Sequence, residues 1–104
     1  MASDKGYLEY IMEQLSALEG VSYKAMMGEY IIYYKGRIAG GIYDDRLLVK
    51  QIPAAEALMP DAPHEKPYPG AKDMLLVENV DDSGFLCRLI DEMYDGLPEP
   101  RKRK

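Results

Sequence analysis

The sequence predicts an α+β domain, built as a two-layer sandwich in which helices lie mainly on one face of an antiparallel sheet. Two observations predict this fold. The stretch from Tyr23 to Lys50 is dense in Tyr, Ile, Val and Gly, and only turn-forming pairs interrupt it. Segments on either side of it carry apolar residues at spacings of three and four, which is typical of amphipathic helices. Consecutive strands flanked by helices indicate the α+β class.

The first helix is expected over Asp4–Glu19. Its apolar residues recur on one stripe, which predicts packing against a sheet. Those residues are Leu8, Ile11, Met12, Leu15 and Leu18. Ser3 or Asp4 can accept the first free amide protons of the helix, and Gly20 lies where a left-handed residue would end it.

Four strands are expected in the central stretch. They are Tyr23–Met27, Glu29–Lys35, Arg37–Tyr43 and Arg46–Lys50. Lys35-Gly36 and Asp44-Asp45 separate the last three, and both pairs suit tight hairpins. Gly40-Gly41 in mid-strand predicts a bulge or the close approach of another backbone.

The second half of the chain is expected to add a short helix, a hairpin and a final helix. The expected elements are the helix Ala54–Met59, an edge strand near Glu65–Tyr68, the strand Met74–Asn79 and a helix capped by Asp81 or Asp82. Tyr68–Ala71 has the Pro-Gly centre of a type II turn. One core is predicted to bury Leu15, Ile32, Val49, Leu76 and Leu89.

The charge distribution argues against nucleic acid as the main partner. The 104 residues include 18 acidic and 13 basic side chains, and Arg101–Lys104 hold four of the basic ones. Nucleic-acid affinity depends on Lys and Arg neutralising phosphates, which an acidic body disfavours. We expect a domain over residues 1–97 and a basic disordered tail over residues 98–104, with at most weak nucleic-acid contact through that tail.

The cysteine count and the first residues predict a cytoplasmic protein without a membrane partner. A single cysteine cannot form an intramolecular disulfide, which fits a reducing compartment. The opening residues, MASDKGYLEY, contain no continuous apolar run and no cleavage signature. No apolar stretch approaches the length of a spanning helix.

The residues that carry chemistry do not form a recognisable active site. Cys87 and His64 are each the only residue of their type, whereas a Cys/His metal site needs three or four ligands. We expect a partly buried structural thiol at Cys87 and a solvated imidazole at His64. Asp44-Asp45 and Asp81-Asp82 occur where a turn or a helix cap needs Asp. The prediction is no enzyme activity, no metal and no cofactor.

The second face of the expected sheet has tyrosines and small residues instead of charges. Tyr33, Ala39, Gly41 and Tyr43 make up this possible interaction face. Tyr is enriched at interfaces, so the face predicts a homodimer or a protein partner. Cover by C-terminal elements would equally explain the same pattern.

A second interpretation is a small-molecule-binding protein. Tyr30, Tyr34, Arg46 and Lys50 could line a cleft that accepts an anion. Mass in solution and a metabolite thermal-shift screen distinguish this interpretation from the interaction module.

The central stretch resembles the N-terminal domain of TfoX/Sxy-type competence regulators. The matching residues run from Met26-Met27-Gly28, through Tyr30 and the Gly36 hairpin, to Asp45–Lys50. The family usually has Phe at the position of Met27 and a second Gly at that of Glu29.

The resemblance extends over nearly the whole chain, because the later helix, hairpin and final helix follow the family's order. It implies a secretion-chaperone-like α+β fold in a stand-alone, single-domain member, without the C-terminal helical domain of two-domain members. The matching motifs are structural instead of catalytic. The resemblance therefore implies a regulatory or protein-interaction module linked to competence or transcription.

Overall fold

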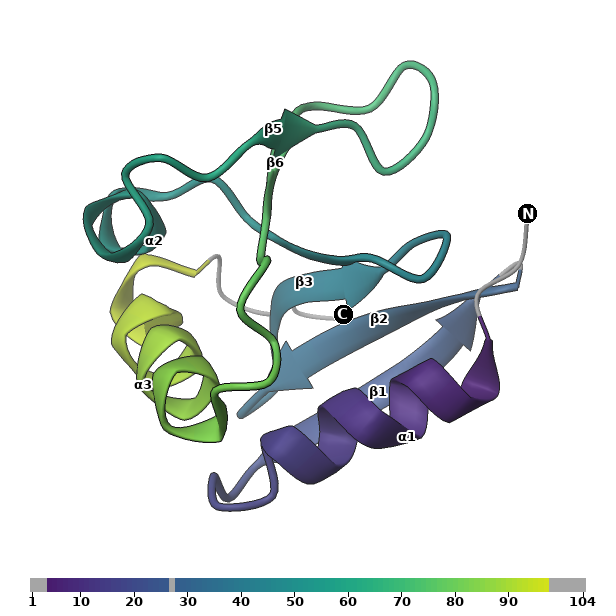
Figure 1. Cartoon of the computed structure of the whole chain (residues 1–104), viewed down its shortest axis with the longest axis vertical. Coiled ribbons are helices and arrows are strands. Elements are labelled where there is room, and N and C mark those ends of the chain that lie inside the picture. The colour runs from purple at the N-terminus through teal and green to yellow at the C-terminus, as the bar shows by residue number, and fades with distance from the viewer. Residues whose placement is uncertain (1–3, 27, 98–104) are drawn as a thin grey trace, which may run out of the picture.

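A six-stranded antiparallel sheet organises the chain, with strand order β1-β2-β3-β4-β6-β5 (Figure 1). The computed structural model describes residues 4–26 and 28–97. In chain order the elements are α1 (Lys5–Gln14), β1 (Val21–Met26), β2 (Glu29–Tyr34), β3 (Arg37–Ile42), β4 (Leu47–Val49), α2 (Pro53–Leu58), β5 (His64–Glu65), β6 (Met74–Leu76), α3 (Ser83–Met93) and the 3₁₀ turn η1 (Tyr94–Gly96). The predicted α+β class is confirmed.

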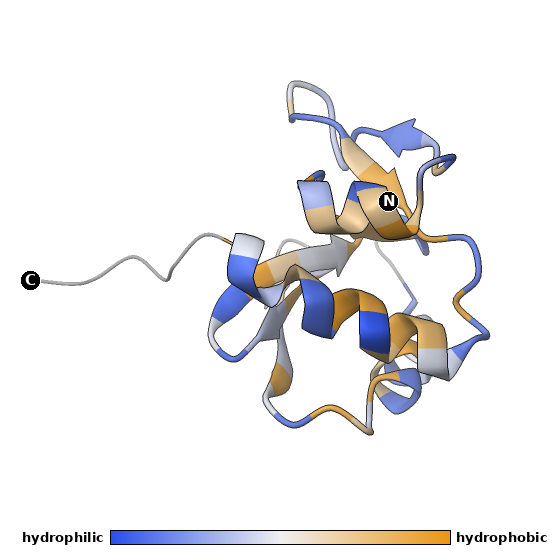
Figure 2. Ribbon diagram, turned by 90° about the vertical axis from the view of Figure 1, so that its left-hand side faces the viewer, coloured by the Kyte–Doolittle hydropathy of each residue, from blue (hydrophilic) through white to orange (hydrophobic). Residues whose placement is uncertain are grey.

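The core lies between one face of the sheet and the helices. Leu8 and Ile11 of α1 join Leu86 and Leu89 of α3 in one buried cluster with residues of β2 and β4. Figure 2 views the molecule from the side that carries α2 and α3. It shows that the outward side of α3 is hydrophilic. Both long helices therefore cover the same face, here called the helix face.

Both predicted hairpins are present and have the left-handed backbone that their residues suggested. Lys35 and Gly36 have φ of 51° and 85°, and Asp44 and Asp45 have φ of 54° and 59°. Positive φ at both central residues is the geometry of a type I′ turn, whose twist matches that of the flanking strands. The turns fix the register of β2 against β3 and of β3 against β4.

The predicted irregularity at Gly40-Gly41 is confirmed as both a bulge and a close backbone approach. The ladder pairs Ile32 with Gly40 but Tyr33 with Ile38, which leaves Ala39 as the extra residue. A Cβ on Gly40 would lie 2.2 Å from the Leu48 carbonyl oxygen of β4. Only glycine permits β3 and β4 to approach this closely.

The first helix is shorter than predicted, because its hydrogen bonds tighten after Leu15. The expected span is Asp4–Glu19, whereas α1 ends at Gln14. The Ser16 amide donates to the Glu13 carbonyl at 3.1 Å and the Leu18 amide to Leu15 at 3.0 Å, so both bonds skip three residues instead of four. The Gln14 carbonyl accepts from the Ser83 hydroxyl at 2.6 Å, which ties this end of α1 to α3. Asp4 caps the helix as expected by accepting from the Gly6 amide.

The hairpin of β5 and β6 also differs from the prediction. β5 is His64–Glu65 instead of Glu65–Tyr68, and β6 ends at Leu76 instead of Asn79. Leu76 is only half-buried, so its predicted place in the core was wrong. Because Val49 of the core pairs with Leu75, Leu75 shares its face and Leu76 points the other way.

The remaining predicted core residues are buried, namely Leu15, Ile32, Val49 and Leu89. The expected basic tail over residues 98–104, like Met27, lies outside the described residues. Among the residues that are described, no helix has the length and apolar character needed to cross a membrane.

Candidate functional site

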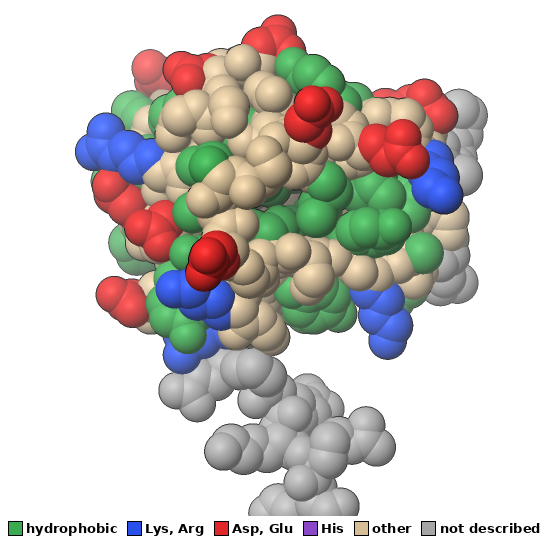
Figure 3. All heavy atoms as spheres, turned by 90° about the horizontal axis from the view of Figure 1, so that it is seen from below, with side chains coloured by type: hydrophobic (Ala, Val, Ile, Leu, Met, Phe, Trp, Pro, Cys, Tyr) green, Lys and Arg blue, Asp and Glu red, His purple; other side chains and the backbone are tan. Residues whose placement is uncertain are grey.

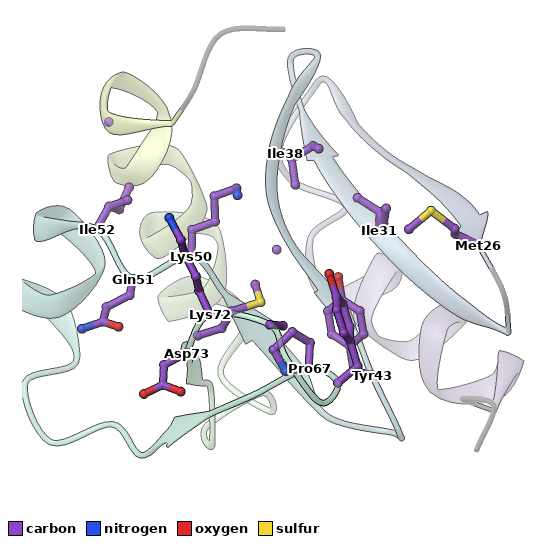
Figure 4. A pocket seen from close by; sticks show the side chains of 15 residues that line it. Met26, Ile31, Ile38, Tyr43, Lys50, Gln51, Ile52, Pro67, Lys72 and Asp73 are labelled. Atoms are coloured by element: carbon purple, nitrogen blue, oxygen red, sulfur yellow. The ribbon is translucent and has the colours of Figure 1, made fainter. Parts of the chain in front are cut away.

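The face of the sheet opposite the helices is hollowed into an open cleft of about 630 Å³ (Figure 4). β1, β2 and β3 supply Met26, Ile31 and Ile38 on one side, and the segment after β4 supplies Lys50 and Ile52. The connection between β5 and β6 completes the wall with Pro67, Tyr68, Ala71, Lys72 and Asp73. The cleft therefore joins segments from both halves of the chain.

Strand alternation explains the apolar side of the cleft. Ile32 faces the core, so its neighbour Ile31 faces the cleft, and the bulge at Ala39 keeps Ile38 on the same side. Met26, Ile38 and Tyr68 are 48%, 39% and 59% exposed. Since clustered exposed apolar side chains mark contact sites, this cleft is the strongest candidate site in the described part of the chain.

The cleft also contains positive charge, although the protein is acidic. Lys50 and Lys72 lie on one side of it, across from Ile31 and Ile38 (Figure 4). Neither ammonium group has an ion-pair partner among the described residues. Asp73, which also lines the cleft, is paired with Lys66 at 2.9 Å, and this hydrogen bond lowers the pKa of Asp73. The lysines are therefore available to an anion.

Tyr43 forms a polar part of the wall. A Cβ on Gly41 would lie 2.7 Å from the Tyr43 ring, so the ring covers the glycine directly. Burial, together with the nearby Tyr68 and Glu29, raises the pKa of Tyr43. The Tyr43 hydroxyl therefore stays protonated at neutral pH.

The predicted ligand cleft of Tyr30, Tyr34, Arg46 and Lys50 does not form as a unit. Tyr34 is 2% exposed and faces the core, where its hydroxyl donates to Asp91 at 2.7 Å. Burial, this hydrogen bond and the Asp91 charge raise the pKa of Tyr34 to about 12. Tyr30 also packs against the core, with its ring edge-to-face on Tyr23.

Arg46 binds within the protein instead of lining the cleft. Its guanidinium contacts Glu65 at 2.6 Å and donates to the Tyr43 carbonyl, which ties the start of β4 to β5. Of the four predicted cleft residues, Lys50 alone lines the observed cleft. The prediction failed because successive strand residues point to opposite faces, and the four were not sorted by face.

The predicted interaction face is only partly accessible. Ala39 is fully buried in the core on the helix face, because it is the extra residue of the bulge. Gly41 is buried beneath Tyr43, and Tyr33 and Tyr43 are half-buried. These four residues thus do not share one exposed surface, and the β5–β6 connection covers part of the face.

The sequence did not predict that Met26, Ile38, Tyr68 and Lys72 line one cleft. The alternation of β2 and β3 and their bulge could have placed Ile31 and Ile38 together. Nothing local predicts that the loop carrying Tyr68 and Lys72 would reach the strands, because that contact depends on where β6 pairs.

The other candidate residues have structural roles. Cys87 is half-buried, with its thiol 3.5 Å from the Gln14 carbonyl, and His64 is exposed. Asp82 caps α3 by accepting from the Phe85 amide, while Asp81 accepts from the Tyr10 hydroxyl. Within the described ranges no group of three or more His, Cys, Asp or Glu could hold a metal ion.

Comparison with known proteins agrees with the fold. Residues 13–95 match the TfoX N-terminal domain family. The chain belongs to this family. This TfoX N-terminal domain is also 30% identical over 105 residues to a Spirochaeta aurantia protein described as an uncharacterized 12.7 kDa protein in the trpE 5′ region. That similarity covers 100% of the chain and 91% of the relative. No solved structure matches the chain.

Proposed function

We propose that this TfoX N-terminal domain is a non-enzymatic binding module whose cleft takes a small amphipathic anion. The observation that carries the proposal is the combination, within about 630 Å³, of exposed apolar side chains and two lysines that have no ion-pair partner in residues 4–26 and 28–97. Ligand sites are commonly clefts of roughly 300–1,000 Å³ with apolar walls and a few polar groups that fix orientation.

The arrangement of the cleft favours an elongated ligand with an apolar body and one anionic end. Met26, Ile31 and Ile38 offer only apolar side-chain atoms to the body. Lys50 and Lys72 offer compact positive charges, which suit a carboxylate or a phosphate group. The flexible Met26 side chain can adapt to ligands of different shape.

A regulatory role fits such a module. The paired carboxylates that could have served acid–base chemistry have structural contacts instead, since Asp44 and Asp45 form a turn, Asp81 accepts from Tyr10 and Asp82 caps α3. Regulation of competence or transcription follows the family resemblance, and a reducing cytoplasm suits the single half-buried Cys87.

Titration calorimetry with decanoate and decyltrimethylammonium tests the proposal, because the probes share an apolar chain and differ in charge. We expect saturable binding of decanoate, weakened by salt, and much weaker binding of the cation. The double variant Lys50→Ala/Lys72→Ala should lose roughly five- to tenfold in affinity for decanoate. Lys5→Ala makes the same kind of charge change on exposed α1 and should bind like the wild type.

Three results would contradict the proposal. Absence of saturable decanoate binding removes the ligand class, and equal binding of both probes removes the role of the lysines. A double variant with wild-type affinity places any binding outside the cleft.

A further inference from the structure

The two edges of the sheet are protected very differently. The β5 edge has only His64–Glu65, with Pro63 and Pro67 close on either side. The β1 edge has six residues, Val21–Met26, five of them exposed. Short strands and prolines are devices that block edge pairing, whereas a long open edge is a template for another strand. Of the two edges, β1 is therefore the one that can pair with a strand of another molecule.

The outward backbone groups of β1 can be assigned from the ladder. The Lys35 amide donates to the Gly20 carbonyl at 2.8 Å, so these two residues face each other as a hydrogen-bonded pair. In an antiparallel ladder such pairs alternate, so Ser22 and Lys24 also bond to β2. Val21, Tyr23 and Ala25 consequently direct their N–H and C=O groups away from the sheet.

We propose that β1 pairs antiparallel with β1 of a second copy of this chain, about a two-fold axis at Tyr23. Tyr23 then lies opposite Tyr23, Val21 opposite Ala25, and Ser22 opposite Lys24. The outward groups of Val21, Tyr23 and Ala25 meet one another and exchange hydrogen bonds. The two sheets join into one continuous sheet, with both helix layers on the same side.

Charge and side-chain pairing favour this register over the registers next to it. An axis at Lys24 would also bring outward groups together, but it places two lysines directly opposite each other, which is destabilising. An axis at Ser22 would bring the outward groups of Val21 and Tyr23 together, but it sets two serines at the centre and separates the tyrosines. An axis between two residues would place outward backbone groups opposite inward ones. The axis at Tyr23 avoids the lysine pair and places two aromatic rings at the centre.

The side chains around the edge fit a protein partner of the same kind. Tyr23 and Met26 are 45% and 48% exposed at this edge. Figure 3 views the side on which α1 and β1 lie and shows a band of hydrophobic side chains crossing it, with acidic side chains above and below the band. A surface with an apolar centre and a polar rim is the pattern of an interface.

A charge-complementation experiment tests both the dimer and its register. We expect the full chain to be a dimer at high micromolar concentration in sedimentation equilibrium. Tyr23→Lys and Tyr23→Glu should each be folded monomers, because each puts like charges together at the axis. An equimolar mixture of the two variants should dimerise again, because Lys then faces Glu. A monomeric wild type, or a mixture that stays monomeric, would overturn the proposal.

A backbone test gives an independent readout. Ala25→Pro removes an outward N–H that the β2 ladder does not use, so it should weaken the dimer while Ala25→Val should not. Amide exchange of Tyr23 and Ala25 should slow as concentration rises, whereas Ser22 and Lys24 should be protected at every concentration. Dimerisation that survives Ala25→Pro but is lost in Tyr33→Asp would place the interface on the sheet face and contradict the edge.

Discussion

The two faces of the sheet contrast in how completely they are closed, although the same strands supply both. On the helix face, Ile32 is 1% exposed and Tyr34 is 2% exposed, and α1 and α3 cover them. On the cleft face, Ile38 is 39% exposed and lines the same cleft as Lys50 and Lys72. Every buried side-chain polar atom of the described residues has a hydrogen-bond partner. We infer that the helix face provides stability and the cleft face is available for binding.

Shortening a buried side chain on the helix face should lower the stability of the protein more than the other changes proposed below. Leu89 of α3 is fully buried in the core, so Leu89→Ala should lower the free energy of unfolding by roughly 2–5 kcal/mol. Urea denaturation followed by circular dichroism measures the change. A loss below about half a kcal/mol would mean that α3 does not pack as described.

High pH should weaken the helix face through Tyr34. The pKa of Tyr34 rises from 10.0 to about 12 on folding, so the folded state favours the neutral phenol. The corresponding stability is fully present below pH 10 and is lost as pH rises through about 12.

Tyr34→Phe isolates this contribution from the other tyrosines. Tyr7 and Tyr43 also have raised pKa values and act in the same direction. The difference in unfolding free energy between the wild type and Tyr34→Phe should therefore shrink between pH 10 and pH 12. A difference independent of pH would show that the Tyr34 phenol is not held neutral by the fold.

The stability of the protein should be sensitive to a side chain at Gly40, where β3 and β4 approach closely. A Cβ there would lie 2.2 Å from the Leu48 carbonyl oxygen, so Gly40→Ala must displace β4 and should cost about 1–3 kcal/mol. Gly84→Ala is the matched control, because its Cβ would meet only Asp82 Oδ1 at 3.6 Å. Equal thermal stability of the two variants would contradict the close approach of β3 and β4.

Truncation of the cleft face should have the smallest effect on stability. Ile38→Ala should lower the free energy of unfolding by only about 1 kcal/mol, because the side chain is already partly exposed. The same variant should weaken decanoate binding, since it removes apolar contact area. A large loss of stability with unchanged binding would reverse the roles assigned to the faces.

Local chemistry made much of this fold predictable. The turns at Lys35-Gly36 and Asp44-Asp45 follow from the conformations that these residues accept, and the close approach of β4 at Gly40 follows from its missing side chain. The tie between α1 and α3 was not predictable, because it joins the Gln14 carbonyl to the Ser83 hydroxyl from a distant part of the chain.

The candidate site was less predictable than the fold for the same reason. Lys50 lines the observed cleft, but Tyr34 lies on the other face and Arg46 pairs with Glu65. The cleft itself depends on the β5–β6 connection reaching the strands. That long-range packing has no signature in the residues alone.

The most direct test of the binding cleft uses the isoleucine methyl groups as reporters of the two faces. Ile31, Ile38 and Ile52 line the cleft, whereas Ile11, Ile32, Ile42 and Ile90 lie in the core of the helix face. Methyl NMR spectra recorded during a decanoate titration should show saturable shifts for the first group and little change for the second. Ile31 and its neighbour Ile32 form an internal control, since they differ only in the face they occupy. Shifts spread equally over both groups, or confined to the core group, would contradict a binding site on the cleft face.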